Sequence, residues 1–390
     1  ARRGDLVLTR TSRLVRLIIA VLAGIYILLN VLTIIIIHVS LPLRILHTVL
    51  AGLLYPTSVV ILSIAPIILL QRIKRPLDNR LIKKAKGIYG RHTGVVIAVA
   101  GSYGKTSMKE LLVKILAEEA GSVRSTVGNM NTLGSQARFA TTLSGSEKFV
   151  IVEFGEGAPG DIARMTDMVD PDYAVITGLA PNHLDEYGSI MAIAEDLNVL
   201  TKHAGKGSAF VNGDSERLKT SFGGRLPSYG QNGFDVWKVA DVKVEIDSLS
   251  FRAVGPKQSI PVRSRLIGRH NTGPIVFAIG LAFKLGVSKG HILSSLEVLE
   301  PYEHRMQPRQ INGAWFIDDT YNGNIEGMLA GLKYLKEIHV TGRKLYATPG
   351  LVDQGIQTKE VHVALGRAIA EANPDQVYLM KNSASGVISH

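Results

Sequence analysis

The order of hydrophobic and polar positions divides the chain into two differently patterned parts. Residues 14–39 and about 45–70 form two nearly unbroken apolar stretches. Each is long enough to cross about 30 Å of hydrocarbon as a helix. From residue 94 onward, short apolar runs alternate with stretches in which apolar residues recur every three or four positions. The first pattern predicts two transmembrane helices, and the second predicts a soluble part that alternates strands with helices.

The two apolar stretches predict a helical hairpin, because the short segment that joins them holds Pro42. Five arginines against Asp5 lie in residues 1–16, and eight lysines or arginines against Asp78 lie in residues 72–91. By the positive-inside rule, both outer ends should face the cytoplasm. A cleaved signal peptide is the alternative for the first stretch, but its apolar run is too long and no small-residue cleavage site follows. The pattern predicts a multi-pass protein of the inner (cytoplasmic) membrane, with its catalytic domains in the cytoplasm.

The soluble part shows the rhythm of a βαβ fold. Residues 149–154 and 173–179 are typical of buried strands, and a helix is expected over 190–204 before a further strand at 207–212. This order indicates a parallel sheet with helices on both faces. Residues 236–266 alternate polar with apolar positions instead, which predicts an antiparallel patch.

Length and composition refine this division. With 390 residues the chain exceeds one ordinary domain. We predict a transmembrane hairpin with basic flanks over 1–91, a central domain over 92–307, and a smaller, incomplete α/β domain over 308–390. The two basic segments carry a charge equal to the formal net charge of +11, so the chain from His92 onward is nearly neutral and no nucleic-acid partner is expected. The absence of cysteine excludes disulfides and thiolate metal sites.

The motif GSYGKTS, residues 101–107, follows an apolar run and opens a predicted helix. A glycine turn between a strand and a helix start aims backbone N–H groups and the positive helix end at one point, where a phosphate can sit. Lys105 adds a cation for the phosphates and Thr106 offers a hydroxyl to Mg²⁺. The longer G-x-x-x-x-G-K-[ST] pattern fails because Val99 stands where it needs glycine. A helix-capping turn without a ligand is therefore the alternative. The residues predicted to hold ATP phosphates are Gly101, Ser102, Tyr103, Gly104, Lys105, Thr106 and Ser107.

Six further motifs follow in a fixed order. They are TVGNMNTLGSQ (126–136), VEFGEGAPGDI (152–162), ITGLAPNHLDEYGS (176–189), GRHNTG (268–273), EHR (303–305) and DDTYNGN (318–324). With these motifs, the chain from residue 94 onward resembles the Mur ligase family, and in particular its members that add D-alanyl-D-alanine. These ATP-dependent enzymes join amino acids or dipeptides to a carboxylate in peptidoglycan synthesis. The resemblance implies an α/β fold, with a P-loop central domain on a parallel sheet and a smaller Rossmann-like domain after it.

The implied chemistry explains several of these residue types. ATP converts a carboxylate to an acyl phosphate, and an amine then displaces the phosphate. Both steps gather negative charge, so hard oxygen ligands and Mg²⁺ are expected. The resemblance makes Glu153 and His183 ligands of Mg²⁺ together with Thr106, and it makes Lys105, Glu153 and His183 the catalytic residues. Without it, Glu153 would be a solvated charge at a strand end, and His183 a structural or surface histidine.

The resemblance also assigns the remaining nucleotide contacts. His270 and Asn271 are expected at the adenine, Arg305 at the phosphates, and Asp318 and Asp319 near the ribose. For the two aspartates, an Asx turn that caps a following helix is an alternative that is compatible with ribose contact.

The substrates are expected to be a muramyl-peptide-like carboxylate and D-Ala-D-Ala or another amine. Asn129, Asn131 and Thr132 match the substrate-side loop of the family, although the same residues are typical of a simple turn. Because the predicted hairpin occupies the place of the usual UDP-binding domain, one hypothesis is that the carboxylate is lipid-linked and presented at the membrane. The alternative is that the hairpin is only an anchor and that another protein supplies sugar recognition.

One departure from the family concerns the second metal. Many members carry a carbamylated lysine that bridges two magnesium ions, and the matching position here is Leu197. Two alternatives stay open. Because related ligases share the central motifs, the chain could act on another, lipid-linked carboxylate; because Leu197 replaces the lysine, it could be a catalytically impaired ATP-binding membrane scaffold.

Overall fold

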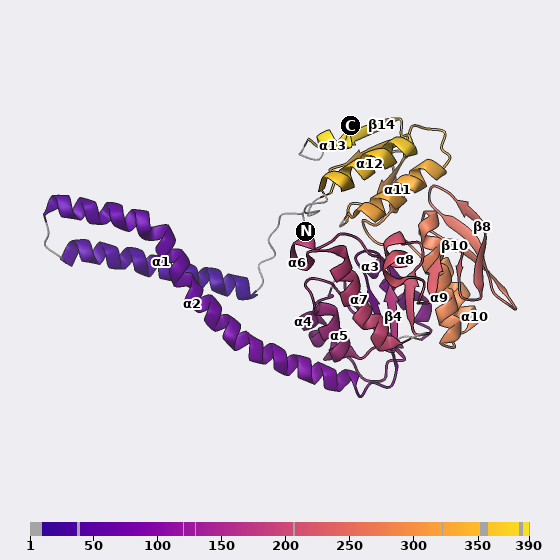
Figure 1. Cartoon of the computed structure of the whole chain (residues 1–390), viewed down its shortest axis with the longest axis horizontal. Helices are drawn as coiled ribbons and strands as arrows, with labels where there is room; N and C mark the ends of the chain where they lie inside the picture. The colour runs from indigo at the N-terminus through magenta and orange to yellow at the C-terminus, as the bar shows by residue number, and fades with distance from the viewer. Residues whose placement is uncertain are drawn as a thin grey trace. The chain divides into compact units, whose positions relative to one another are not determined.

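The computed structural model describes residues 10–36, 40–119, 121–128, 130–205, 207–321, 323–351, 358–381 and 385–389 (Figure 1). The contacts between residues divide the chain into two compact units, Ala1–Leu81 and Ile82–His390.

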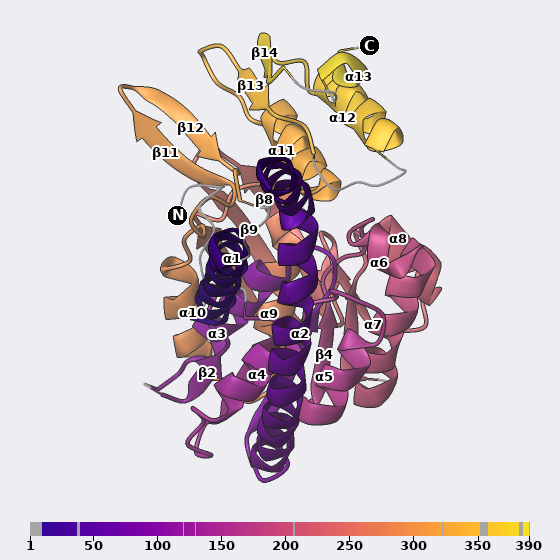
Figure 2. The same cartoon turned by 90° about the vertical axis from the view of Figure 1, so that its left-hand side faces the viewer.

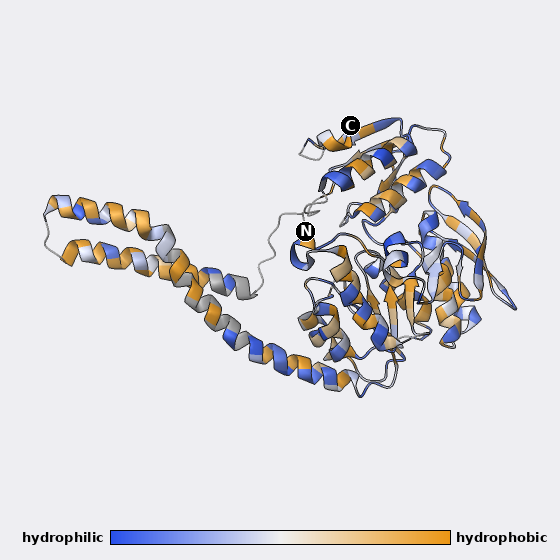
Figure 3. Cartoon of the chain, in the orientation of Figure 1, coloured by the Kyte–Doolittle hydropathy of each residue, from blue (hydrophilic) through white to orange (hydrophobic). Residues whose placement is uncertain are grey.

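The N-terminal part is helical, as its apolar stretches predict. Helix α1 runs over Arg10–Ile36 and α2 over Leu41–Tyr89. Figure 3 shows apolar residues along α1 and the first half of α2, and mostly polar residues toward the end of α2. The second helix is longer than predicted because the basic segment after residue 70 contains good helix formers and continues the same helix. Residues 37–39, which end the predicted first helix, lie outside the described residues.

The prediction of a multi-pass membrane protein with two spanning helices is wrong. Within the described residues, one helix is long and apolar enough to cross a membrane, Arg16–Ile36, with a mean hydropathy of 2.7. The second stretch contributes a shorter apolar segment, Leu41–Tyr55. One candidate helix does not support a multi-pass localisation.

The part that carries the motifs is built on one large sheet. In spatial order its described strands are β10 (Ser259–Ser264), β9 (Leu249–Val254), β8 (Trp237–Val244), β7 (Gly233–Phe234), β6 (Ser228–Gly230), β5 (Ala209–Asn212), β4 (Tyr173–Ile176), β1 (Val95–Ala100), β3 (Phe149–Glu153) and β2 (Val123–Ser125). Neighbours from β2 to β6 pair in parallel, and those from β6 to β10 pair antiparallel. The predicted α/β class, with an antiparallel patch beside a parallel sheet, is confirmed.

Two groups of helices pack against this sheet, on either side of β4 in Figure 2. Helix α3 (Lys105–Leu116) packs on α9 (Thr272–Lys284) and α10 (Lys289–Glu297), and α5 (Asp161–Val169) packs on α7 (Ile190–Ala204). The other helices of this part are α4 (Leu133–Ala140), α6 (Leu184–Tyr187), α8 (Glu216–Phe222) and the short η1 (Arg269–Asn271). Met108, Leu111, Leu112 and Ile115 recur at helical spacing and bury one face of α3.

The strand order creates a crevice at the end of β1. Strand β1 lies between β3 and β4, although β3 follows it in sequence only after β2. Val99 pairs with Glu153 on one side, and Ala100 pairs with Ile176 on the other. Ligands of open parallel sheets bind outside the carboxyl ends of such strands. The loops after β1, β3 and β4 therefore meet at one edge, and these loops carry three of the motifs.

The last part of the chain has a small core of its own. It contains the hairpin β11 (Gln307–Ile311) and β12 (Ala314–Asp318), the parallel pair β13 (Leu345–Thr348) and β14 (Gln376–Leu379), and the helices α11 (Ile325–Glu337), α12 (Thr358–Ala372) and α13 (Ser385–Ile388). Leu332 of α11 and Leu365 of α12 are buried together in this core. The domain boundaries at residues 91 and 307 stay predictions.

Candidate functional site

The loop between β1 and α3 has the backbone of a phosphate-binding turn. Gly101 has φ 128° and Gly104 has φ 77°, backbone conformations that residues other than glycine rarely adopt. A Cβ on Gly101 would lie 2.8 Å from the carbonyl oxygen of Gly178. Glycine is therefore required both for the turn and for its close approach to the loop after β4.

Residues after β4 hold this loop in place. The backbone N–H of Ser102 donates to Gly178 O at 2.8 Å, and Asn182 Nδ2 donates to Ser102 O at 2.9 Å. The Thr177 hydroxyl contacts the carbonyl oxygens of Ala100 and Tyr103. Asn182 therefore helps to hold the phosphate loop in place.

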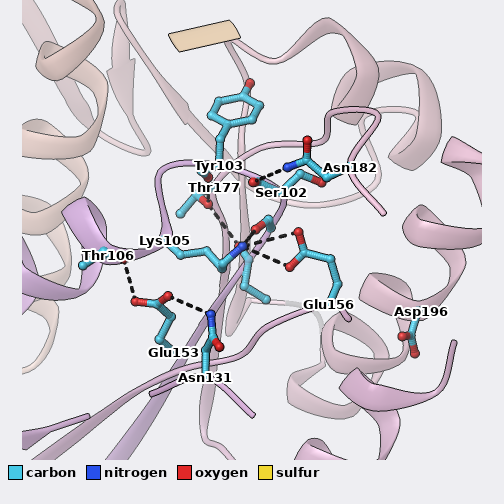
Figure 4. Close-up of polar contacts among 12 residues, drawn as sticks. Ser102, Tyr103, Lys105, Thr106, Asn131, Glu153, Glu156, Thr177, Asn182 and Asp196 are labelled. Carbon is cyan, nitrogen blue, oxygen red and sulfur yellow. Dashed lines mark hydrogen bonds and ion pairs between the residues drawn. The ribbon is translucent and has the colours of Figure 1, made fainter. Parts of the chain in front are cut away.

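Glu153 lies at the end of β3, beside the start of α3. Its side chain is buried, with 1% of the residue exposed. Thr106 Oγ1 donates to Glu153 Oε2 at 2.9 Å, and Asn131 Nδ2 donates to Oε1 at 3.3 Å (Figure 4). Hydroxyl and carboxylate oxygens are the ligands that Mg²⁺ prefers. The structure thus brings together two of the three residues predicted to hold the metal.

The P-loop lysine makes an ion pair that the sequence did not predict. Lys105 Nζ lies 3.1 Å from Oε2 and 3.3 Å from Oε1 of Glu156, and it also donates to Gly101 O (Figure 4). The side chain of Glu156 is 1% exposed. Its position three residues after Glu153, in the loop after β3, is the sequence signal that could have identified it.

A second lysine on the same face of α3, Lys109, also has a structural role that the sequence did not predict. Lys109 is completely buried, and its Nζ donates to Thr126 O and Gly128 O, both at 2.7 Å. The same nitrogen lies 3.6 Å from Glu153 Oε2. Lys109 therefore ties α3 to the start of the predicted substrate loop. Its spacing of four residues from Lys105 could have indicated a shared helix face.

His183 and Leu197 do not join this cluster. His183 is exposed at the start of α6, with φ 53°, and no hydrogen bond or ion pair in the described residues links it to Glu153. No group of three His, Asp or Glu side chains in that part of the chain is arranged to hold a metal ion. Leu197 is fully buried on α7, and its neighbour Asp196 accepts hydrogen bonds from the Tyr187 hydroxyl and Gly160 N. The metal-binding role of His183 stays a prediction.

A cleft of about 360 Å³ opens beside the phosphate loop. Seven of the predicted nucleotide residues line it, namely Tyr103, Gly104, Ser107, His270, Asn271, Arg305 and Asp319. Gly101, Ser102, Lys105, Thr106 and Asp318 do not line this cleft. The cleft and the pairs Lys105–Glu156 and Thr106–Glu153 thus use different residues of the same P-loop turn.

The polar groups of the cleft are held by local contacts. Burial lowers the pKa of His270 to about 4, so its ring is neutral at pH 7. Asn271 Nδ2 donates to Ile267 O at 2.7 Å. The guanidinium of Arg305 stacks 4.7 Å above the ring of Tyr321. A neutral ring, an amide and a stacked cation provide the mixed surface that a nucleotide base and its phosphates require.

The two predicted ribose aspartates have different surroundings. Asp319 is exposed overall, but desolvation at the wall of the cleft raises the pKa of its carboxyl group, which accepts from Met306 N at 3.1 Å. Burial also acts to raise the pKa of Asp318, but hydrogen bonds from His304 and Thr320 outweigh it and hold the pKa below its ordinary value. Asp318 accepts from Thr320 N, two residues on, as the Asx-turn alternative requires.

The predicted substrate loop is only partly described. Asn129 lies outside the described residues. Asn131 points its amide at Glu153, and Thr132 caps α4 by accepting from Ser135 N. Thr132 therefore has the local role expected of a simple turn residue, as the cap of α4. Its role in substrate binding stays a prediction.

Comparisons with known proteins agree with these motifs. A sequence model of the Mur ligase middle domain matches residues 99–282. The chain is 26% identical over 311 residues to the UDP-N-acetylmuramoyl-tripeptide--D-alanyl-D-alanine ligase of Escherichia coli (strain K12), covering 76% of this chain and 68% of the relative. It is 29% identical over 304 residues to the ligase of that name from Synechocystis sp., covering 76% and 64%. The chain thus spans about two thirds of the length of these relatives.

Solved structures match over the same share of the chain. A crystal structure of MurF from Acinetobacter baumannii has a TM-score of 0.71 at 25% identity, covering 80% of this chain and 69% of that one. MurF ligase from Thermotoga maritima in complex with ADP has a TM-score of 0.70 at 25% identity, covering 80% and 72%. With the ordered motifs, the P-loop turn and the sheet on which they lie, these matches show that residues 99–282 of this chain form a Mur ligase middle domain.

Proposed function

We propose that this chain is an ATP-dependent amide-bond-forming ligase that adds D-alanyl-D-alanine to the peptide carboxylate of a muramyl tripeptide in peptidoglycan synthesis. The observation that carries the proposal is the placement of Lys105, Thr106 and Glu153 around one P-loop turn, at the edge of the nucleotide-sized cleft. The names of the matched relatives supply the substrate pair.

The cleft takes the nucleotide in this proposal. A matched MurF structure holds ADP, and the cleft here has His270 and Asn271 at one side and the phosphate loop at the other. The N–H groups of residues 102–106 and the start of α3 attract the phosphates. Arg305 and Lys105 add the cations on which phosphoryl transfer depends.

Thr106 and Glu153 are proposed to hold Mg²⁺, because their oxygens lie 2.9 Å apart at the phosphate loop and form a hard donor set. His183 is the proposed third ligand. When bound, Mg²⁺ would neutralise charge on the transferring phosphoryl group. The protein residues position the groups: Lys109 and Asn131 hold Glu153, and Asn182 holds the P-loop.

The loop over residues 126–132 is proposed to face the acceptor peptide, because Lys109 and Asn131 connect it directly to Glu153. The acceptor is proposed to be a muramyl tripeptide, and the amine D-Ala-D-Ala. The matched relatives are named for a UDP-linked acceptor, so the UDP-linked tripeptide is the first substrate to test.

Phosphate release tests this proposal. The purified chain with Mg²⁺ and ATP should release phosphate only when UDP-N-acetylmuramoyl-tripeptide and D-Ala-D-Ala are both present. Lys105→Ala should reduce the rate at least a hundredfold, because it removes the phosphate cation. Lys114→Ala, on the same helix with its amine on Val298 O, is the matched control and should retain the rate. No release with any acceptor would favour an ATP-binding scaffold instead.

A further inference from the structure

Glu156 is a buried carboxylate with one cationic partner. In the described part of the chain, its ion pair is with Lys105, and Lys105 has no other acidic partner. Lys105 Nζ also donates a hydrogen bond to the carbonyl oxygen of Gly101. Figure 4 shows Glu156 reaching the lysine from the loop after β3, on the side opposite Glu153. The donors of the P-loop lysine are therefore already occupied.

A phosphate in the P-loop must compete for those donors. The lysine of a G-K-[ST] turn contacts nucleotide phosphates, and Glu156 holds the nitrogen by both carboxylate oxygens. A bound phosphate also brings negative charge next to the carboxylate. A buried charge that loses its partner is strongly unfavourable, so a nucleotide without a compensating cation meets two penalties at this site.

We propose that Glu156 couples nucleotide binding to a divalent cation. Its carboxylate holds Lys105 when no nucleotide is bound. It gives up the lysine when phosphate binds, and the compensating charge then comes from the divalent cation that accompanies the phosphates. The inference rests on the proposed nucleotide site. It adds a residue that makes this site favour a nucleotide bound with a divalent cation over a nucleotide without one. Glu156 acts through Lys105 and is a positioning residue.

A purely structural ion pair would behave differently. If Glu156 only braced the loop, its neutral variant would weaken ADP binding equally with and without metal, because the loop would lose order in both cases. Competition predicts the opposite sign without metal. Neutralising Glu156 frees Lys105 for phosphate and removes the repulsion, so metal-free ADP should bind more tightly.

The test compares ADP affinity by isothermal titration calorimetry in Mg²⁺ and in EDTA, using the whole chain. Wild type should bind ADP at least tenfold more weakly in EDTA. Glu156→Gln, which keeps the side-chain volume, should tighten metal-free binding about tenfold and bring the ratio of the two dissociation constants close to one. Glu118→Gln is the matched control, because it neutralises a partly exposed partner of Lys148 beyond the end of α3. Its ratio should equal that of wild type.

Each other result is decisive. An unchanged ratio in Glu156→Gln, or weaker metal-free binding, overturns this inference and leaves the ligase proposal intact. If wild type binds no ADP in either condition, both proposals fail. If Glu156→Gln does not fold by circular dichroism, Glu156→Asp applies, since it withdraws the charge from Lys105 by one methylene. A ratio that falls in Glu156→Asp supports the coupling, and a ratio equal to wild type contradicts it.

Discussion

Lys109 shows how one buried side chain positions the metal end of the site. The lysine is fully buried and donates to two backbone carbonyls of the loop after β2, while its charge faces Glu153. Buried cations are stable only when paired and hydrogen-bonded. Lys109 meets both conditions, and in doing so it fixes Glu153 relative to the substrate loop.

Replacing this lysine should therefore destabilise the fold. Lys109→Met keeps the length of the apolar stem, but it removes the donor to the Thr126 and Gly128 carbonyls and the cation beside Glu153. We expect the free energy of unfolding to fall by about 2 to 4 kcal/mol, measured by urea denaturation. Lys114→Met on the same helix is the control, because its amine is at the surface. A loss below about 0.5 kcal/mol in Lys109→Met would contradict the role assigned here.

His270 should make stability depend on pH. Its folded-state pKa is about 4, below the ordinary value of 6.5, because burial disfavours the charged ring. The unfolded chain therefore binds the proton first as pH falls. The contribution of the neutral ring is complete above pH 6.5 and is lost progressively toward pH 4. Between pH 7 and pH 5 the expected loss is about 2 kcal/mol.

Urea denaturation at pH 7 and pH 5 measures this effect. His270→Gln, which cannot titrate, should show a smaller difference in unfolding free energy between the two values than wild type. His203→Gln is the control, because that histidine is partly exposed and paired with Asp170 at the surface. An equal pH dependence in wild type and His270→Gln would contradict the lowered pKa of His270.

At the element scale, the turn from β1 to α3 depends on the glycine after β4. A Cβ on Gly178 would lie 2.2 Å from the ring of Tyr103. Tyr103 lines the cleft and belongs to the phosphate loop. The two loops can pack this closely only because residue 178 has no side chain.

Gly178→Ala should therefore displace the phosphate loop and weaken ADP binding at least tenfold, as measured by calorimetry with Mg²⁺. Gly290→Ala is the matched control, because a Cβ at this helical position meets no atom within 4 Å. Wild-type affinity in Gly178→Ala would show that the contact with Tyr103 does not position the loop.

Elements with a strong periodic signal were predictable from the sequence. The strands β3 and β4 are continuous apolar runs, as expected for parallel strands buried on both faces, and both lie within their predicted ranges. The two-residue strand β7 has no such signal, because cross-strand pairing rather than hydrophobic periodicity defines it. Glu156 and Lys109 were missed for a related reason: their partners lie 51 and 17 to 19 residues away in the chain.

At the scale of the whole molecule, ordered motifs predicted the family and the α/β class, whereas hydropathy predicted one spanning helix too many. Apolar residues about 45–70 gave a long window, but within the described residues only Leu41–Tyr55 forms an apolar segment of α2. The same helix also includes the basic segment after residue 70. Several motifs in a fixed order indicate a single fold that positions all of them. An apolar stretch, by contrast, does not show where a helix ends.

The whole chain is proposed to form an amide through an acyl phosphate, and isotope transfer tests that step directly. The tripeptide acceptor is labelled with ¹⁸O in its reacting carboxylate and incubated with the chain, ATP, Mg²⁺ and D-Ala-D-Ala. The proposal predicts that each pentapeptide formed yields one phosphate carrying one ¹⁸O atom, measured by mass spectrometry. Pentapeptide accompanied by unlabelled phosphate, or no pentapeptide under any of these conditions, would contradict it.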